Sequence, residues 1–166
     1  MNKALIIVDM QNDFISGALA VPRASEIVGP IQDYAFEKYS KENYTILLTR
    51  DLHPKYHCSF VAHGGHWPPH CVVGTIGARI QVGLGLMANE YNWPVLSKGK
   101  EANLEEYSGF PVCRQLLRDW DIHEVEICGL ARDYCVEATY QDCVKVYPKT
   151  VILESLCRSV NLRPEF

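Results

Sequence analysis

The chain has 166 residues, of which 48% are apolar and 22% charged, and its formal net charge is −4. This length fits a single domain, residues 1–166, that buries roughly two-thirds of the surface its unfolded form would expose. The absence of a basic run argues against a nucleic-acid partner. No apolar run approaches the roughly 18 residues that a membrane span requires, so no membrane association is expected.

The chain contains seven cysteines. Their number is odd and no secretion signal precedes them, so reduced thiols in a cytoplasmic protein are expected. No pair has the CxxC spacing of a four-cysteine zinc site. Most of them are therefore expected to be small buried hydrophobic residues.

The expected elements alternate along the chain between apolar strands and amphipathic helices. The first, "ALIIVDM" (4–10), predicts a buried strand that ends in an acid, and it lacks the cleavage site of a signal peptide. After a long loop, Ile27, Ile31, Tyr34 and Ala35 have helical spacing. The remaining expected elements are a strand over 44–51, a loop of about forty residues with one short element at most, a strand over 93–99, a helix marked by Val112, Leu116, Leu117 and Trp120, a strand over 124–130, a helix marked by Val136, Tyr140, Cys143 and Val144, and a strand over 149–155.

This alternation predicts an α/β fold: a three-layer, doubly wound parallel sheet with helices on both faces. In such sheets the ligand site lies beyond the carboxyl ends of the strands. Asp9, Asp51, Lys98 and the segment 129–136 stand at those ends. Three charged groups and a cysteine are therefore expected in one crevice.

Cys135 lies five residues past the fourth strand, at the start of an expected helix, where unpaired N–H groups favour a thiolate. A free thiol is only slightly ionised at neutral pH, so it needs a neighbouring base or cation. Asp9 and Lys98 suit these roles, and the three form a plausible set for acyl transfer. The alternatives are a core cysteine under the helix, a turn-forming aspartate and a solvated lysine, and spacing alone does not separate Lys98 from Lys100.

Five of the six histidines lie between residues 53 and 70. Asp51 and His53 are two residues apart, so an extended chain places both side chains on one side. His70 could return from the loop to complete a three-ligand site, which is typical of a catalytic metal with open positions. The alternative is a surface loop with scattered histidines, and this interpretation is preferred for His63 and His66.

Five motifs then resemble a known family: "ALIIVDMQNDF", "TRDLHPKYHCSF", "WPPHCVVGTIGA", "KGKEANLEEYSGF" and "GLARDYCVEAT". Together, and in this order, they are similar to the nicotinamidase (pyrazinamidase) family of the isochorismatase-like cysteine hydrolase superfamily. The resemblance runs from residue 4 to about residue 163. It implies an isochorismatase-like fold and a metal-dependent amidase that converts nicotinamide to nicotinate and ammonia in NAD salvage.

The resemblance also implies a role for individual residues. Asp9 matches the general base, Cys135 the nucleophile and Lys98 the catalytic lysine, which a shorter motif spacing would place at Lys100. The peptide before Ala131 is expected to be cis, with the N–H groups of Ala131 and Cys135 forming an oxyanion hole. The other matched positions are the metal ligands Asp51, His53 and His70, with His57 as a further ligand in some members, and the ring-pocket aromatics Phe14, Trp67 and Tyr107.

The metal implied is one divalent ion, with zinc preferred over iron or manganese, since two imidazoles and a carboxylate suit all three. The substrate is expected to bind with its pyridine nitrogen on this metal or on a metal-held water. Two rival functions stay open: a related amidohydrolase acting on an N-carbamoyl or ureidoacrylate-type amide, and an inactive binding or structural relative. The metal set argues against the first, because such relatives generally lack it.

Two positions depart from the family pattern. Arg132 stands where the family usually has a small polar residue, so it is expected to alter the pocket or to point to solvent. After "SVNLRPEF" (159–166) the family usually continues with a helix and a last strand, which are absent from this sequence. A missing strand would expose a sheet edge, which makes a homo-oligomer one expectation.

Overall fold

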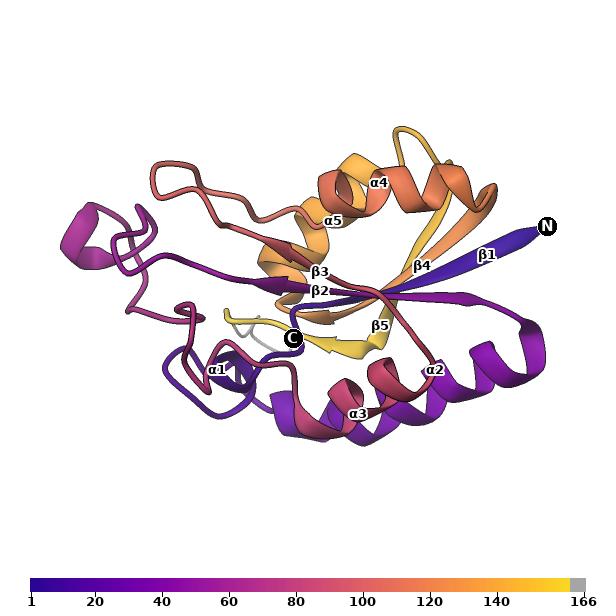
Figure 1. Ribbon diagram of the computed structural model, residues 1–166, viewed down its shortest axis with the longest axis horizontal. Coiled ribbons are helices and arrows are strands. Elements are labelled where there is room, and N and C mark those ends of the chain that lie inside the picture. Colours follow the sequence, from indigo (N-terminus) through magenta and orange to yellow (C-terminus); the bar gives the residue numbers. More distant parts are fainter. Residues whose placement is uncertain (162–166) are drawn as a thin grey trace, which may run out of the picture.

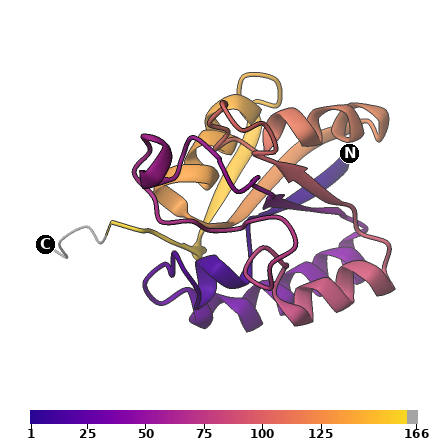
Figure 2. The same cartoon turned by 60° about the vertical axis from the view of Figure 1, so that its left-hand side comes forward.

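Five parallel strands form one sheet in the order β3-β2-β1-β4-β5 in the computed structural model, which describes residues 1–161 (Figure 1). The helices α2 and α3 cover one face, and α4 and α5 cover the other, which the turned view in Figure 2 also shows. This arrangement confirms the doubly wound α/β fold. The strands are β1 (Asn2–Val8), β2 (Thr45–Asp51), β3 (Val95–Lys98), β4 (Ile122–Leu130) and β5 (Lys149–Arg158). The α-helices are α1 (Asn12–Ile15), α2 (Val28–Glu42), α3 (Val82–Glu90), α4 (Phe110–Asp119) and α5 (Glu137–Cys143), and shorter helical turns are η1 (Ala24–Ile27), η2 (Val61–His63) and η3 (Arg132–Val136).

The core of the molecule is centred on β1. The side chains from Ala4 to Val8 are fully buried, as expected for a strand with helices on both sides. β1 pairs with β2 on one side and with β4 on the other. The chain leaves β1 for β2 and later returns to β4, so the strand order reverses between β1 and β4. Ligand sites in open α/β sheets lie at this kind of reversal.

The loop after β2 holds more helix than its composition indicated. It contains the turn η2 and the nine-residue α3, where at most one short element was expected. Gly83 and Gly85 lower the helix propensity of this segment. Burial of Leu84 and Ala88, and the Gln81 side chain that accepts a hydrogen bond from the Leu84 N–H, favour the helix in its tertiary context.

β5 is the last element of the sheet in residues 1–161 and forms one of its edges. It runs three residues beyond the expected strand, and Val151 on it is 51% exposed. No helix or further strand follows it within residues 1–161, and residues 162–166, on which the expected absence of a last helix and strand bears, lie outside the described part of the chain. In the same described residues, no helix combines the length and apolar character that crossing a membrane requires.

Candidate active site

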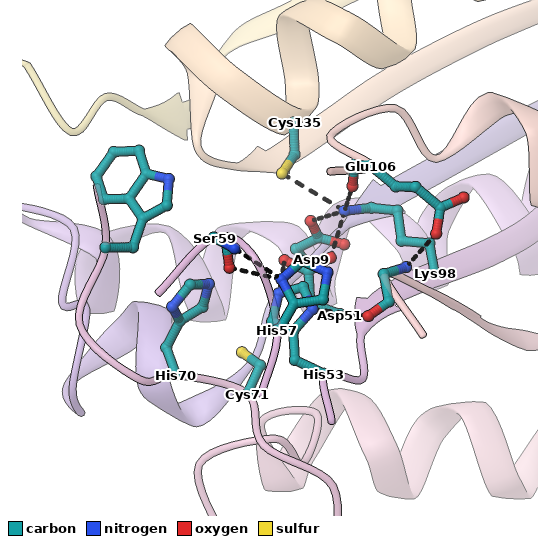
Figure 3. A network of polar contacts seen from close by, with 12 residues as sticks. Asp9, Asp51, His53, His57, Ser59, His70, Cys71, Lys98, Glu106 and Cys135 are labelled. Carbon is teal, nitrogen blue, oxygen red and sulfur yellow. Dashed lines mark hydrogen bonds and ion pairs between the residues drawn. The ribbon is translucent and has the colours of Figure 1, made fainter. Parts of the chain in front are cut away.

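The strand ends bring four reactive side chains together (Figure 3). Asp9 follows β1, Asp51 and Lys98 are the last residues of β2 and β3, and Cys135 lies in η3 after β4. All four are at least 94% buried. The crevice expected at the carboxyl edge of the sheet is therefore present, and it lies at the reversal of strand order.

Lys98 is at the centre of this group. Its Nζ lies 2.9 Å from Asp9 Oδ2, 2.6 Å from Asp51 Oδ1 and 3.5 Å from Cys135 Sγ. The register of the sheet explains the contact with Asp51, because the two residues are direct partners across β2 and β3. Lys100 is exposed, so the geometry selects Lys98 of the two lysines.

Burial sets the protonation of the group. It raises the pKa of the Cys135 thiol well above its ordinary value, and Lys98 opposes this shift. Burial raises the pKa of Asp9 as well, again against Lys98. Burial also acts to raise the pKa of Asp51, but Lys98 and His53 hold it below the ordinary value. The sulfur therefore rests as a thiol beside a carboxylate whose raised pKa suits a proton acceptor.

One further hydrogen bond orients Asp9, and the carboxylate lies close to the thiol. The Thr49 hydroxyl donates a hydrogen bond of 2.7 Å to Asp9 Oδ1. An oxygen of Asp9, an oxygen of Asp51 and the sulfur of Cys135 all lie within 4.8 Å of one another. Asp9 is thus held by Thr49 and Lys98 within short reach of the thiol.

A second cluster lies beside the first. One ligand atom each of Asp51, His53 and His70 lies within 4.8 Å of the others. His53 Nδ1 is 2.8 Å from the Gly99 carbonyl oxygen, and His70 Nδ1 is 2.7 Å from that of Pro68. A carbonyl oxygen only accepts, so each Nδ1 carries a proton, and each Nε2 is left as the ring atom that could bind a metal. One carboxylate and two such imidazoles fit a divalent metal ion.

The position after Lys98 requires a glycine, Gly99. Its φ of +65° is a left-handed conformation, and a Cβ there would lie 2.5 Å from His53 Cε1. Any side chain would push the imidazole out of place. The same glycine therefore allows both the close approach and the carbonyl contact that orients His53.

His57 lies next to this cluster but faces other partners. Its ring stacks on His53 with centroids 4.0 Å apart. Its Nδ1 is 2.7 Å from Ser59 Oγ and its Nε2 is 3.0 Å from the Leu104 carbonyl oxygen, so both nitrogens are engaged. This arrangement does not support His57 as a ligand. His63 and His66 are exposed, which agrees with the surface interpretation.

A small pocket, partly open to solvent, joins the two clusters. Trp67 and Tyr107 are linked across it by an indole N–H that donates to the phenol oxygen at 3.1 Å. Tyr134 packs edge-on against Trp67 with ring centroids 5.0 Å apart. The expected pocket residues are all in its lining: Phe14, Trp67, Tyr107, Asp51, His53, His70, Ala131 and Cys135.

Four lining residues were not predicted from the sequence: Leu19, Glu105, Tyr134 and Val160. Tyr134 directly precedes Cys135, and Glu105 lies two residues before Tyr107, so each had a motif residue nearby as a signal. Leu19 and Val160 carry no such signal, because ordinary aliphatic residues outside the motifs are indistinguishable from core residues.

The segment after β4 has the expected backbone. The Leu130–Ala131 peptide is cis, and Ala131 and Cys135 both line the pocket. Arg132 neither lines the pocket nor points freely to solvent, because its guanidinium forms ion pairs with Glu137 and Glu154. The cation is thus held between α5 and β5.

Comparison with known proteins agrees with this geometry. Residues 3–164 match the family model described as the isochorismatase domain. A nicotinamidase/pyrazinamidase of Mycobacterium tuberculosis is 36% identical over 170 residues, covering 96% of this chain and 88% of that protein. A pyrazinamidase of Pyrococcus horikoshii, solved in complex with zinc, has a TM-score of 0.85 at 35% identity and covers 97% of this chain and 88% of its own.

A third relative is PnC1 from L. infantum, solved in complex with nicotinate. It has a TM-score of 0.85 at 35% identity, with 96% of this chain and 82% of that chain covered. The family model and the curated relative both extend over nearly the whole sequence. This chain is a member of the isochorismatase family.

Proposed function

We propose that this protein is a nicotinamidase: a metal-dependent cysteine amidase that hydrolyses nicotinamide, and also pyrazinamide, to the acid and ammonia in NAD salvage. The observation that carries the proposal is the meeting of the Cys135, Asp9 and Lys98 group with a three-ligand metal set at one small aromatic pocket. The relatives named above as nicotinamidase or pyrazinamidase support it.

The first half of the reaction forms a thioester. Asp9 accepts the proton of the Cys135 thiol, and the sulfur attacks the amide carbon. The N–H groups of Ala131 and Cys135 stabilise the oxyanion, a contribution of about 3 kcal/mol per donor in comparable sites. As the C–N bond breaks, Asp9 returns the proton to the nitrogen, and ammonia leaves.

The second half releases the acid. Water gives a proton to Asp9 and attacks the thioester carbonyl, and the C–S bond breaks. The sulfur leaves as a thiolate and recovers the proton from Asp9, which completes the cycle. Lys98 stabilises the developing charge on sulfur, since its ammonium is 3.5 Å away. Phe14, Trp67 and Tyr107 hold the aromatic ring of the substrate.

The metal ligands in this proposal are Asp51, His53 and His70. A divalent ion held by these three residues would supply a positive centre that attracts the electron-rich ring nitrogen of the substrate. Zinc is proposed, because the donor set suits it and the P. horikoshii relative was solved with zinc. The protein is further proposed to act in the cytoplasm, as its cysteines indicate.

The test is ammonia release from nicotinamide by the purified protein, with and without a chelator. Turnover that a chelator removes and zinc restores supports the proposal. An N-carbamoyl amide measured in parallel separates the rival amidohydrolase. Turnover of the carbamoyl amide alone, or of neither substrate after metal loading, would reject the proposal that this protein is a nicotinamidase.

A further inference from the structure

The carboxylate of Asp133, two residues before Cys135, accepts hydrogen bonds from the segment that follows β5. Its Oδ1 accepts the Val160 N–H at 2.9 Å, and its Oδ2 accepts the Asn161 N–H at 2.9 Å. The Asn161 side-chain amide also donates to Oδ2, at 3.1 Å. Both oxygens of one carboxylate thus hold two successive backbone N–H groups, which is a strong and directional arrangement.

These hydrogen bonds hold the side chain of Val160 in the lining of the pocket. Val160 lines the same pocket as Cys135, and it packs against the buried core. The Asn161 amide nitrogen also lies 3.5 Å from the hydroxyl of Tyr134, another lining residue. The segment 160–161 is therefore attached to the nucleophile-bearing turn at two neighbouring residues, and Val160 closes one side of the pocket.

From this geometry we infer that Asp133 is a positioning residue and Val160 a specificity-determining residue, which together limit the pocket to an unsubstituted six-membered aromatic amide. The inference rests on the proposed function for its substrate class. Neither residue touches the reacting atoms. Val160 acts by occupying the space that a ring substituent would need, and Asp133 acts by holding Val160 there.

The variants Val160→Ala, Asp133→Asn and Asp133→Ala test this inference. Steady-state kinetics are measured with nicotinamide and with each of its ring-methylated isomers. Val160→Ala should raise kcat/KM for at least one methylated isomer, relative to nicotinamide, by about tenfold, the low end of what one methylene is worth in an apolar pocket. Asp133→Ala should also raise kcat/KM for a methylated isomer relative to nicotinamide. Asp133→Asn should raise it less, because the amide of the asparagine keeps one acceptor.

Two controls match these changes. Val151→Ala removes the same atoms from an exposed site on β5, and Asp142→Asn removes the same charge from an exposed ion pair on α5. Both should keep the wild-type ratio. With nicotinamide, the Asp133 variants should show a higher KM and a kcat within about threefold of wild type, since the reacting groups stay in place.

A second measurement does not depend on the substrate. Alkylation of Cys135 by iodoacetamide and by its bulkier N-benzyl derivative is followed by mass spectrometry of the Cys135 peptide. The alkylation rate with the bulky reagent, divided by the rate with the small one, should rise in Val160→Ala and in the Asp133 variants. It should not rise in the controls. This readout tests the wall even if nicotinamide proves not to be the substrate.

The inference is overturned if Val160→Ala leaves both ratios within twofold of wild type. A lower rate for every substrate and reagent in Asp133→Ala, at an unchanged ratio, would mean that Asp133 has only a structural role. If Asp133→Ala does not fold, Asp133→Asn decides the role of the carboxylate. If both ratios then rise in Val160→Ala but neither rises in Asp133→Asn, the positioning role of Asp133 is rejected.

Discussion

Replacing Lys98 by Met should destabilise the protein strongly, because it leaves two buried carboxylates without their cation. Lys98 Nζ lies 2.9 Å from Asp9 and 2.6 Å from Asp51, and all three are at least 96% buried. At an effective dielectric constant of about 20, each attraction is about 6 kcal/mol before the cost of desolvation is subtracted. Removing one partner of a buried ion pair costs about 3–5 kcal/mol net.

The assay is thermal unfolding followed by circular dichroism, in chelator so that metal does not contribute. For a chain of this length, the loss corresponds to a fall in Tm of about 10 °C. Lys100→Met is the matched control, since this exposed lysine lies two residues away, and it should melt within about 2 °C of wild type. Equal melting temperatures for the two variants would refute the central place given to Lys98.

The pH dependence of the loss follows from the pKa shifts. Lys98 has its pKa raised well above 10.5 by Asp51 and Asp9, against burial, so its stabilisation is present throughout the neutral range. Asp51 has its pKa lowered by Lys98 and His53, against burial, so its contribution is present above 3.8 and fades at lower pH. The pKa of Asp9 is already raised by burial, against Lys98. Without Lys98, burial raises the pKa of Asp9 further and also raises that of Asp51, so the variant loses stability more steeply than the wild type as pH rises above about 4. The gap in Tm should therefore be wider at pH 8 than at pH 5.

Three further outcomes are expected. Cys135→Ala should abolish ammonia release while metal content, measured by elemental analysis, stays unchanged; hydrolysis at a comparable rate would exclude it as the nucleophile. His53→Asn and His70→Asn should weaken metal binding at least tenfold in a competition titration, whereas His57→Asn should not, because its ring nitrogens are engaged elsewhere. Arg132→Ala should keep kcat/KM within about twofold, since its ion pairs lie outside the pocket, and a larger loss would show that the cation reaches the substrate.

The sheet and the reactive group were predictable from the sequence for the same reason. Near-continuous apolar runs form strands buried on both faces, and parallel strands deliver the residues after them to one edge. Asp9, Asp51, Cys135 and a lysine at the end of the third strand follow from that rule without any coordinates. The choice between Lys98 and Lys100 does not, because it depends on where β3 ends and on which residue faces Asp51.

The pocket was less predictable than the reactive group. His57 has the residue type of a ligand, but Ser59 and the Leu104 carbonyl occupy its nitrogens. Only the folded loop reveals such partners. Val160 lies far along the chain from every motif, and it reaches the pocket through the carboxylate of Asp133. Contacts of this kind join segments by shape and hydrogen bonding, which a one-dimensional pattern does not record.

The register of the four-residue strand β3 fixes the contacts of two functional side chains, Lys98 and His53. Lys98 sits opposite Asp51 in the ladder, and the next carbonyl, that of Gly99, orients His53. Sliding this edge strand by one position along β2 would turn its side chains to the opposite face. The ammonium would leave its carboxylates, and the imidazole would lose its acceptor in the same movement. In the proposed mechanism, proton transfer and metal binding therefore both depend on the pairing of β3, the shortest strand within residues 1–161.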